Sequence, residues 1–198
     1  MTEERSAVTD GTPDMNNRLP IFDRSNATKE QVAILDEIVK GPRGNLDGPF
    51  LSWIHSPKLA NQAQRLGAFC RYETGLPLRL SELAILVIAA YWRSQAEWHI
   101  HHPIALEAGL PHHVAEAVQQ GTTPIFDDDD DWLVYTFSTE LNETRRVSDE
   151  TYELAVKRFG HMVVVNLTGL LGCYTLVAMT LNVFGNRAEG QVGLPFPE

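Results

Sequence analysis

The 198-residue sequence predicts an all-α protein. Three observations support this fold class. Apolar residues recur at spacings of three and four along most of the chain, and these runs are bounded by capping residues, glycines and prolines. No alternating strand pattern and no Asn-Gly hairpin signal occurs in the sequence. Apolar residues make up 43% of the chain, so a core can form without disulfides or a structural metal.

The first half of the chain predicts three helices in order. Residues 28–31 form a capping-box pattern that starts the first helix, which the Gly-Pro pair at 41–42 ends. A second helix is expected to begin at Ser56, with proline in its first turn. Ser81 is the expected N-cap of a third helix, residues 82–92. That helix is apolar on nearly every side, which predicts a central and buried position.

The second half predicts further helices. One is expected from Gln95 to Ala108, with a kink or a late start at Pro103, because proline has no backbone N–H to donate. Glycine at position 109 suits the end of that helix. Three more helices are predicted at 111–120, 127–144 and 148–159.

The last apolar segment, residues 161–185, contains no Lys, Arg, Asp or Glu. Its length would suit a membrane span. Asparagine, threonine and tyrosine residues, however, are spread through it. We therefore expect a buried central helix, or one that another subunit covers, and no membrane partner.

Composition narrows the class of protein further. The formal net charge of −10 disfavours binding to nucleic acid or to anionic membranes. Cys70 and Cys173 are far apart in the sequence, so we expect two separate buried apolar side chains and no redox pair. The polar N-terminus has no apolar signal region, and a cytoplasmic location is expected. Residues 1–25 are predicted to be a flexible arm, and residues 26–198 a single helical domain.

The polar residues with the most chemical promise lie between residues 81 and 110. Ser94, Glu97 and His101 are spaced to share one helix face, and Glu97 and His101 are neighbours one turn apart. Glu82 lies on the preceding apolar helix, and packing of the two helices would bring it to that face. Two carboxylates and an imidazole in an apolar enclosure can transfer protons, because burial and like charge raise a carboxylate pKa.

Simpler interpretations stay open on spacing alone. Glu82 suits a helix N-terminus, where its charge interacts with the helix dipole. Glu97 and His101 suit an exposed surface pair. The acidic run at 127–131 lacks the spacing of a calcium loop and is interpreted as a solvated helix cap.

The same stretch is similar to the carboxymuconolactone decarboxylase and alkylhydroperoxidase D superfamily. Peroxidases of that family carry Glu, eleven residues, and then Cys-x-His-Cys-x-x-x-His. The corresponding positions here are Glu82, Ser94, Ala96, Glu97 and His101. The sequence QAEWHIHHPIALEAGL at 95–110 resembles the decarboxylase-like branch. So do the segments at 41–51, 55–67 and 175–185, and the resemblance spans about residues 20–185.

The resemblance implies an alkylhydroperoxidase D-like helical bundle that forms homo-oligomers, trimers or hexamers. Ser94 and Glu97 fill both redox cysteine positions, so thiol peroxidase activity is not expected. The family's decarboxylases suggest instead a cofactor-independent lyase or isomerase. Its small-molecule substrate would be a carboxylated lactone or a related intermediate of aromatic-compound breakdown. Glu82, Glu97 and His101 are the expected catalytic residues, with no cofactor and no metal.

Three further residues are expected to bind the substrate. Arg43, in a glycine-rich loop, would hold a substrate carboxylate. Ser94 and Trp98 would line the pocket. Two alternatives stay open: a metal-dependent oxygenase or hydrolase in which Glu82, Glu97 and His101 supply three ligands, and a non-catalytic protein that retains the pocket to bind ligands.

Overall fold

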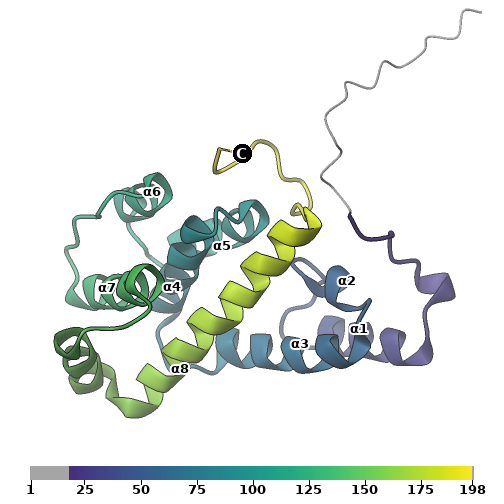
Figure 1. The fold of residues 1–198 in the computed structure, drawn as a ribbon, viewed down its shortest axis with the longest axis horizontal. Coiled ribbons are helices and arrows are strands. Elements are labelled where there is room, and N and C mark those ends of the chain that lie inside the picture. The colour runs from purple at the N-terminus through teal and green to yellow at the C-terminus, as the bar shows by residue number, and fades with distance from the viewer. Residues whose placement is uncertain (1–17, 198) are drawn as a thin grey trace, which may run out of the picture.

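The computed structural model describes residues 18–197, and within this range every regular element is a helix (Figure 1). The all-α prediction is confirmed for this part of the chain. Most of the predicted N-terminal arm, residues 1–17, lies outside the described residues. The elements are η1 (Arg24–Asn26), α1 (Lys29–Lys40), α2 (Phe50–Trp53), α3 (Pro57–Tyr72), α4 (Leu78–Tyr91), α5 (Gln95–Glu107), α6 (His112–Gln120), α7 (Asp129–Thr144) and α8 (Asp149–Phe184).

Helix α4 occupies the centre of the molecule, as its all-round apolar sequence predicts. One set of its side chains, including Ile85, packs with residues of α7 and α8. Another set, including Leu86, packs with residues of α5 and α6. Ile85 and Leu86 are both fully buried. Because helices surround α4, apolar side chains are needed on most of its faces, and its two charged residues, Arg79 and Glu82, are both paired with neighbouring helices.

The predicted start of α4 at Ser81 is wrong. The helix begins at Leu78, and Pro77 occupies the N-cap position. The extra turn buries Leu80 completely. The Ser81 hydroxyl donates to the carbonyl oxygens of Leu78 at 3.1 Å and of Pro77 at 3.3 Å, within the helix itself. Glu82 therefore lies one turn inside α4, where it is buried, and not at an exposed helix terminus.

Helix α8 joins two segments that the sequence predicts as separate helices. The break between them is at Gly160, with φ 82° and ψ 160°, a backbone conformation that glycine adopts far more readily than other residues. Figure 1 shows the bend at the lower end of α8. By length and composition α8 is apolar enough to cross a membrane, a property that core helices of soluble proteins share. Here it packs into the main core through Leu167, Leu170 and Leu171.

The opposite face of α8 is exposed and apolar. Met162, Val165, Met179 and Val183 follow one side of the helix and are all exposed. No charged residue interrupts this face between positions 161 and 185. Nothing in the described residues covers it.

The acidic run is only partly the solvated cap that the sequence suggests. Asp128 does cap α7, because its side chain accepts the N–H groups of Asp130 and Asp131. Asp131, however, is only 2% exposed and is ion-paired with Arg79 of α4. Asp130 pairs with Arg158 of α8. The run therefore ties α7 to two neighbouring helices.

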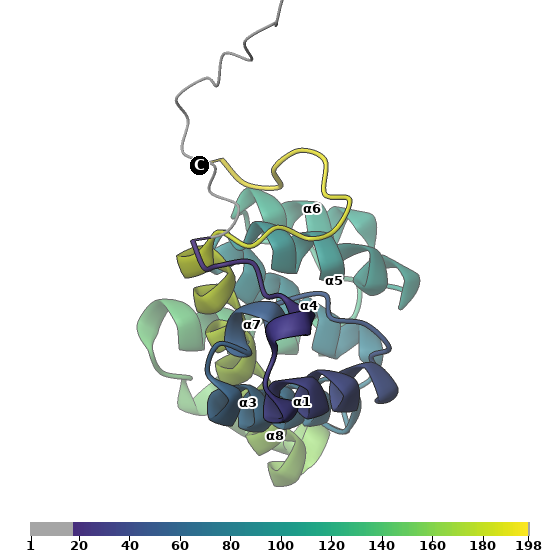
Figure 2. The ribbon, with the colours of Figure 1, turned by 90° about the vertical axis from the view of Figure 1, so that its right-hand side faces the viewer.

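The C-terminal segment returns over α5 and α6, as Figure 2 shows. Gln95 holds the backbone of Phe196 through two hydrogen bonds, donating to its carbonyl oxygen at 2.8 Å and accepting its N–H at 3.0 Å. The Phe196 ring meets Trp98 edge to face, with centroids 5.3 Å apart. Helix α5 runs through Pro103 without interruption.

Candidate active site

A short turn between α4 and α5 brings the central residues of the site together. Arg93 in this turn has φ 47°, and α5 then folds back against α4. As a result, Nδ1 of His101 lies 2.7 Å from Oε2 of Glu82. Glu82 is 1% exposed and His101 is 4% exposed. The predicted approach of Glu82 to the α5 face is confirmed, and the interpretation of Glu82 as a terminal charge is wrong.

The contact with Glu82 organises the imidazole of His101. In the neutral ring, an Nδ1–H that donates to the carboxylate leaves the lone pair on Nε2. Nε2 makes no hydrogen bond within residues 18–197. The second carboxylate oxygen of Glu82, Oε1, is buried and also has no partner in this range. Glu82 is therefore a positioning residue that acts through His101.

Tyr174 of α8 packs against the other side of His101. The two rings meet edge to face, with centroids 5.1 Å apart and an interplanar angle of 89°. The phenol is buried and makes no hydrogen bond of ordinary geometry within the described residues. Burial raises the pKa of Tyr174, and the negative charge of Glu82 adds to the rise. The sequence carries no signal for Tyr174, because it is one tyrosine in an otherwise apolar helix.

Glu97 lies one turn before His101 on α5 and is 1% exposed. Neither of its carboxyl oxygens has a well-formed hydrogen bond in the described part of the chain. Burial raises the pKa of Glu97 well above its ordinary value, while the nearby Ser94 hydroxyl opposes the rise and Cys173 adds to it. The Glu97 carboxyl group therefore keeps its proton to a higher pH than an exposed glutamate does, in the direction that the sequence predicts for a buried carboxylate.

His101 and Glu97 both line one small cavity. Its volume is about 30 Å³, room for one or two water molecules. The walls come from the loop before α2, from α2 and α3, and from α5 and α8. Glu82 is not part of the lining and lies behind His101. The lining residues are Arg43, Asp47, Gly48, Pro49, Phe50, Trp53, Gly67, Glu97, Ile100, His101, Cys173, Tyr174, Val177 and Leu181.

Arg43 lies at the rim of this cavity, where the sequence analysis expects it. Its guanidinium group is 4.8 Å from the centre of the Phe50 ring and has no ion-pair partner within residues 18–197. Burial lowers the pKa of Arg43, and the nearby charge of Arg71 lowers it further. Both arginines and His99 line an adjoining recess of about 300 Å³. Asp47 and Glu189 line the same recess, so the rim carries both signs of charge, with Arg43 as the cation that also lines the small cavity.

Two of the expected pocket residues do not line the cavity. Trp98 packs among residues of α4 and α6, with His102 stacked on it at a centroid distance of 5.4 Å. The interpretation of Trp98 as a pocket wall is therefore wrong for this cavity, because the C-terminal segment and α6 supply a different apolar surface for it. Ser94 is fully buried at the start of α5 and influences the site only through Glu97.

The three-ligand metal arrangement finds no support in the geometry. Among the described residues, no three His, Cys, Asp or Glu side chains are grouped as a metal-ligand set. Glu82, Glu97 and His101 are thus close neighbours without being arranged as ligands of a common ion.

The fold also brings together the two cysteines that the sequence separates. Cys70 on α3 and Cys173 on α8 are buried free thiols of one core cluster, and they lie close enough to shift each other's pKa. The expectation of buried side chains is correct, but the expectation that they lie apart is wrong. A gap of about 100 residues carries no signal of this contact. Cys173 also lines the cavity beside Glu97 and His101.

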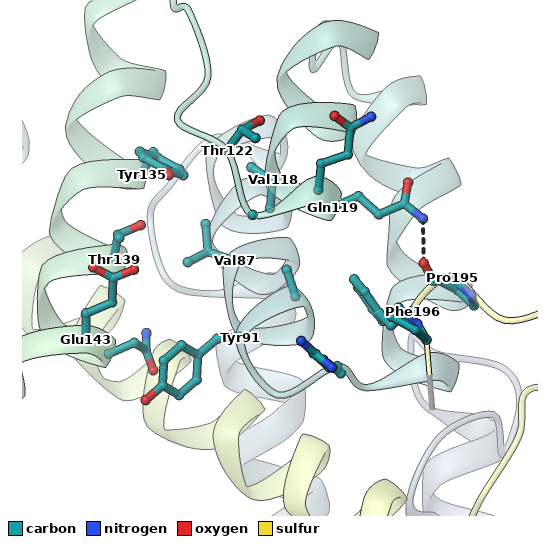
Figure 3. A pocket seen from close by; sticks show the side chains of 16 residues that line it. Val87, Tyr91, Val118, Gln119, Thr122, Tyr135, Thr139, Glu143, Pro195 and Phe196 are labelled. Atoms are coloured by element: carbon teal, nitrogen blue, oxygen red, sulfur yellow. Dashed lines mark hydrogen bonds between the residues drawn. The ribbon is translucent and has the colours of Figure 1, made fainter.

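A second, larger recess lies beneath the C-terminal segment. Figure 3 shows its walls, formed by α4, α6, α7 and residues 195–197. Its volume is about 720 Å³. The Gln119 side chain at its edge donates to the Pro195 carbonyl oxygen at 3.0 Å. Its titratable residues, which include Tyr91 and Glu143, are exposed or half-buried. None has the buried, unpartnered character of Glu97.

Comparison of the chain with protein-family models, with curated proteins and with solved structures finds no match. The likeness to the carboxymuconolactone decarboxylase and alkylhydroperoxidase D superfamily therefore stays a hypothesis that depends on the residues quoted for it. The geometry of Glu82, Glu97, His101 and Arg43 is the observation that points to a function.

Proposed function

We propose that this protein is a cofactor-independent acid–base enzyme, a decarboxylase-type lyase or an isomerase. Its substrate is a small carboxylated lactone or a related intermediate of aromatic-compound breakdown. One observation carries the proposal. Glu82 holds Nδ1 of His101 and leaves Nε2 free, while His101 and Glu97, whose pKa burial raises, line the same cavity.

The two residues that line the cavity suit opposite roles. His101, with its lone pair on Nε2, accepts a proton from the substrate, and Glu82 stabilises the imidazolium that forms. Glu97, neutral because of its burial, donates a proton to the carbanion or enolate that remains after CO2 leaves or after a proton is removed. A positioned acid or base typically accelerates such a step about 10²–10⁴-fold.

Arg43 gives the site its preference for an anion. A guanidinium group binds a carboxylate through two parallel hydrogen bonds, and Arg43 has no competing ion-pair partner in the described residues. In this proposal Arg43 holds a carboxylate that does not react, because a strong cation on the departing carboxylate would oppose the loss of CO2. The reacting carbon then faces the cavity.

Substrate entry requires the loop before α2 to move. The cavity of about 30 Å³ admits only water-sized molecules, far less than a lactone needs. This loop carries Arg43 and contains Gly44 and Gly48, both with positive φ. We propose that it opens to admit the substrate and closes with Arg43 over its anionic group.

The first test measures CO2 release from γ-carboxymuconolactone and from a panel of related lactone acids and β-keto acids. Wild type is compared with His101→Ala. Wild type is expected to release CO2 from at least one member, and the variant is expected to lose this activity about 10²–10⁴-fold. Far-UV circular dichroism of both proteins controls for folding.

The outcomes separate the remaining function classes. Release that is equal in the two proteins would remove His101 from the mechanism. Binding of panel members without any turnover, with both proteins folded, would favour the non-catalytic alternative. A metal found in purified wild type by elemental analysis, together with turnover that a chelator abolishes, would favour the metal-dependent alternative.

We also propose that the protein is a homo-oligomer, a trimer or a hexamer, in which a second copy covers the exposed apolar face of α8. Met162, Val165, Met179 and Val183 lie on that face. Light scattering is expected to give a multiple of the 22.1 kDa chain mass, and Val165→Glu is expected to lower it. Ile125→Glu, at a residue 80% exposed outside α8, is the matched control and should leave the mass unchanged. A wild-type mass of one chain would contradict the proposal.

A further inference from the structure

The thiol pair beside the candidate active site has the geometry of an oxidation site. Cys70 and Cys173 come from different helices, α3 and α8, which pack against each other. Their side chains belong to the same buried cluster and lie close enough to shift each other's pKa. They are the only two cysteines of the chain. Two neighbouring thiols can form a disulfide where their backbones are close enough, and these two lie on helices that contact each other.

The two thiols differ in their access to small molecules. Cys173 lines the cavity that contains Glu97 and His101, while Cys70 does not and is 0% exposed. Arg43, Asp47 and Ile100 line both this cavity and the adjoining recess, so they form the route inward. A cavity of about 30 Å³ accepts a molecule as small as hydrogen peroxide and excludes larger oxidants.

We propose that Cys70 and Cys173 form an intramolecular disulfide when hydrogen peroxide enters the cavity, and that Cys173 is the thiol that peroxide oxidises first. This inference does not rest on the proposed function, because it follows from the contact between the thiols and from the lining of the cavity.

The chemistry balances in two steps. In the first, the sulfur of Cys173 bonds to one peroxide oxygen as the O–O bond breaks, and the thiol proton ends on the departing oxygen as water, which leaves a sulfenic acid. In the second, the sulfur of Cys70 attacks the sulfur of Cys173, the S–O bond breaks, and the Cys70 proton leaves with the hydroxyl as a second water. Each sulfur loses one electron, and each peroxide oxygen gains one.

The contact between the thiols favours the second step. The contact with Cys173 lowers the pKa of Cys70, and the same contact together with burial raises the pKa of Cys173. The lower pKa of Cys70 makes it the better nucleophile for the second step, whereas access through the cavity, and not the acidity of its thiol, makes Cys173 the first to react. Disulfide formation would draw Cys173 towards α3 and remove a neighbour of Glu97 from the cavity wall.

The test compares the full-length protein with Cys70→Ser and Cys173→Ser, each of which keeps one thiol. Each protein is treated with hydrogen peroxide, unfolded, alkylated with N-ethylmaleimide and measured by intact mass spectrometry. Wild type is expected to lose two hydrogens and both alkylation sites, and to regain the sites after reduction. Cys70→Ser is expected to accumulate a sulfenic acid at residue 173, trapped by dimedone. In Cys173→Ser, Cys70 is expected to remain a thiol.

Three results would overturn the proposal. In the first, wild type keeps both thiols under a peroxide treatment that oxidises a small free thiol. In the second, the disulfide links two chains. In the third, Cys70 in Cys173→Ser is oxidised as fast as the thiols of wild type. Treatment of the two single variants in denaturant controls for folding, because access through the cavity no longer matters there and both thiols should react at similar rates.

Discussion

The recess beneath the C-terminal segment is much larger than the cavity beside His101, but the cavity contains the polar groups that are better suited to chemistry. The recess has a volume of about 720 Å³ and the cavity about 30 Å³. The small cavity, however, contains the buried and unpartnered Glu97, whereas the titratable groups of the recess have access to water. Water screens charges and restores ordinary pKa values, so a large open recess has little power to tune a proton donor. Catalysis is therefore expected in the small cavity, where buried polar groups lack hydrogen-bond partners.

The largest effect expected from this comparison is on turnover. Glu82→Gln keeps the size of the side chain, but its amide can donate to Nδ1 of His101 and so favour the opposite tautomer, with the proton on Nε2. We expect kcat to fall about 10²–10⁴-fold and the pH profile of kcat to shift. Steady-state kinetics against pH on the substrate found by the CO2 assay measure both changes.

The matched control is Glu143→Gln in the large recess, which makes the same chemical change at an exposed carboxylate. It is expected to leave kcat unchanged. An equal fall in kcat in both variants would contradict the contrast between the cavity and the recess. An unchanged pH profile of kcat in Glu82→Gln would contradict it too.

A smaller effect is expected on substrate affinity. Arg43→Ala removes the cation at the rim of the cavity, and a hydrogen bond to a charged group is worth about 1.5–3 kcal/mol. We expect KM to rise about tenfold or more, with a smaller change in kcat. Arg65→Ala on α3, where Arg65 is exposed and paired with Glu37, is the control and should leave KM unaltered. A normal KM in Arg43→Ala would remove this residue from substrate binding.

The smallest expected effect is on stability, and it depends on pH. Because burial raises the pKa of Glu97 in the folded protein, the unfolded chain releases this proton at lower pH, near the ordinary value of 4.5. Above that pH, Glu97 lowers the free energy of unfolding by up to about 1.4 kcal/mol per pH unit, until the pH reaches the folded-state pKa. Glu97→Gln does not titrate and should be more stable than wild type by a margin that grows with pH.

Urea denaturation at several pH values measures this margin. Glu143→Gln in the recess should show no such growth. A constant difference between wild type and Glu97→Gln across pH 5–8 would mean that Glu97 is ionised in the folded protein. That result would also remove Glu97 as a proton donor.

Much of the fold could be predicted from the sequence because its signals are local. The capping box at Thr28 and Gln31 is present in the structure, and Gly109 ends its helix with φ 96°. The burial of α4 follows from its composition. The start of that helix was misplaced because Ser81 is a good N-cap by type, whereas the burial of Leu80 decides where the helix begins. Packing overrides the local preference there.

The site could be predicted only where its residues share a helix or where the resemblance aligns them. Glu97 and His101 are one turn apart, and Glu82 corresponds to the family's glutamate. Tyr174 and the pair of cysteines come from α3 and α8, and only tertiary packing brings these helices to the cavity. A single sequence contains no periodic signal for contacts over such distances. The C-terminal segment that draws Trp98 away from the cavity could not be foreseen for the same reason.

The central position of α4 has a consequence for the motions of the molecule. Its backbone amides lie beneath α5, α6, α7 and α8, so no local fraying of one neighbour exposes them to solvent. Hydrogen exchange from α4 then requires the whole fold to open, and its slowest amides report the global free energy of unfolding. Glu82, which holds His101 in place, lies on this helix. Its backbone amide is therefore expected to be among the last in the molecule to exchange hydrogen with solvent.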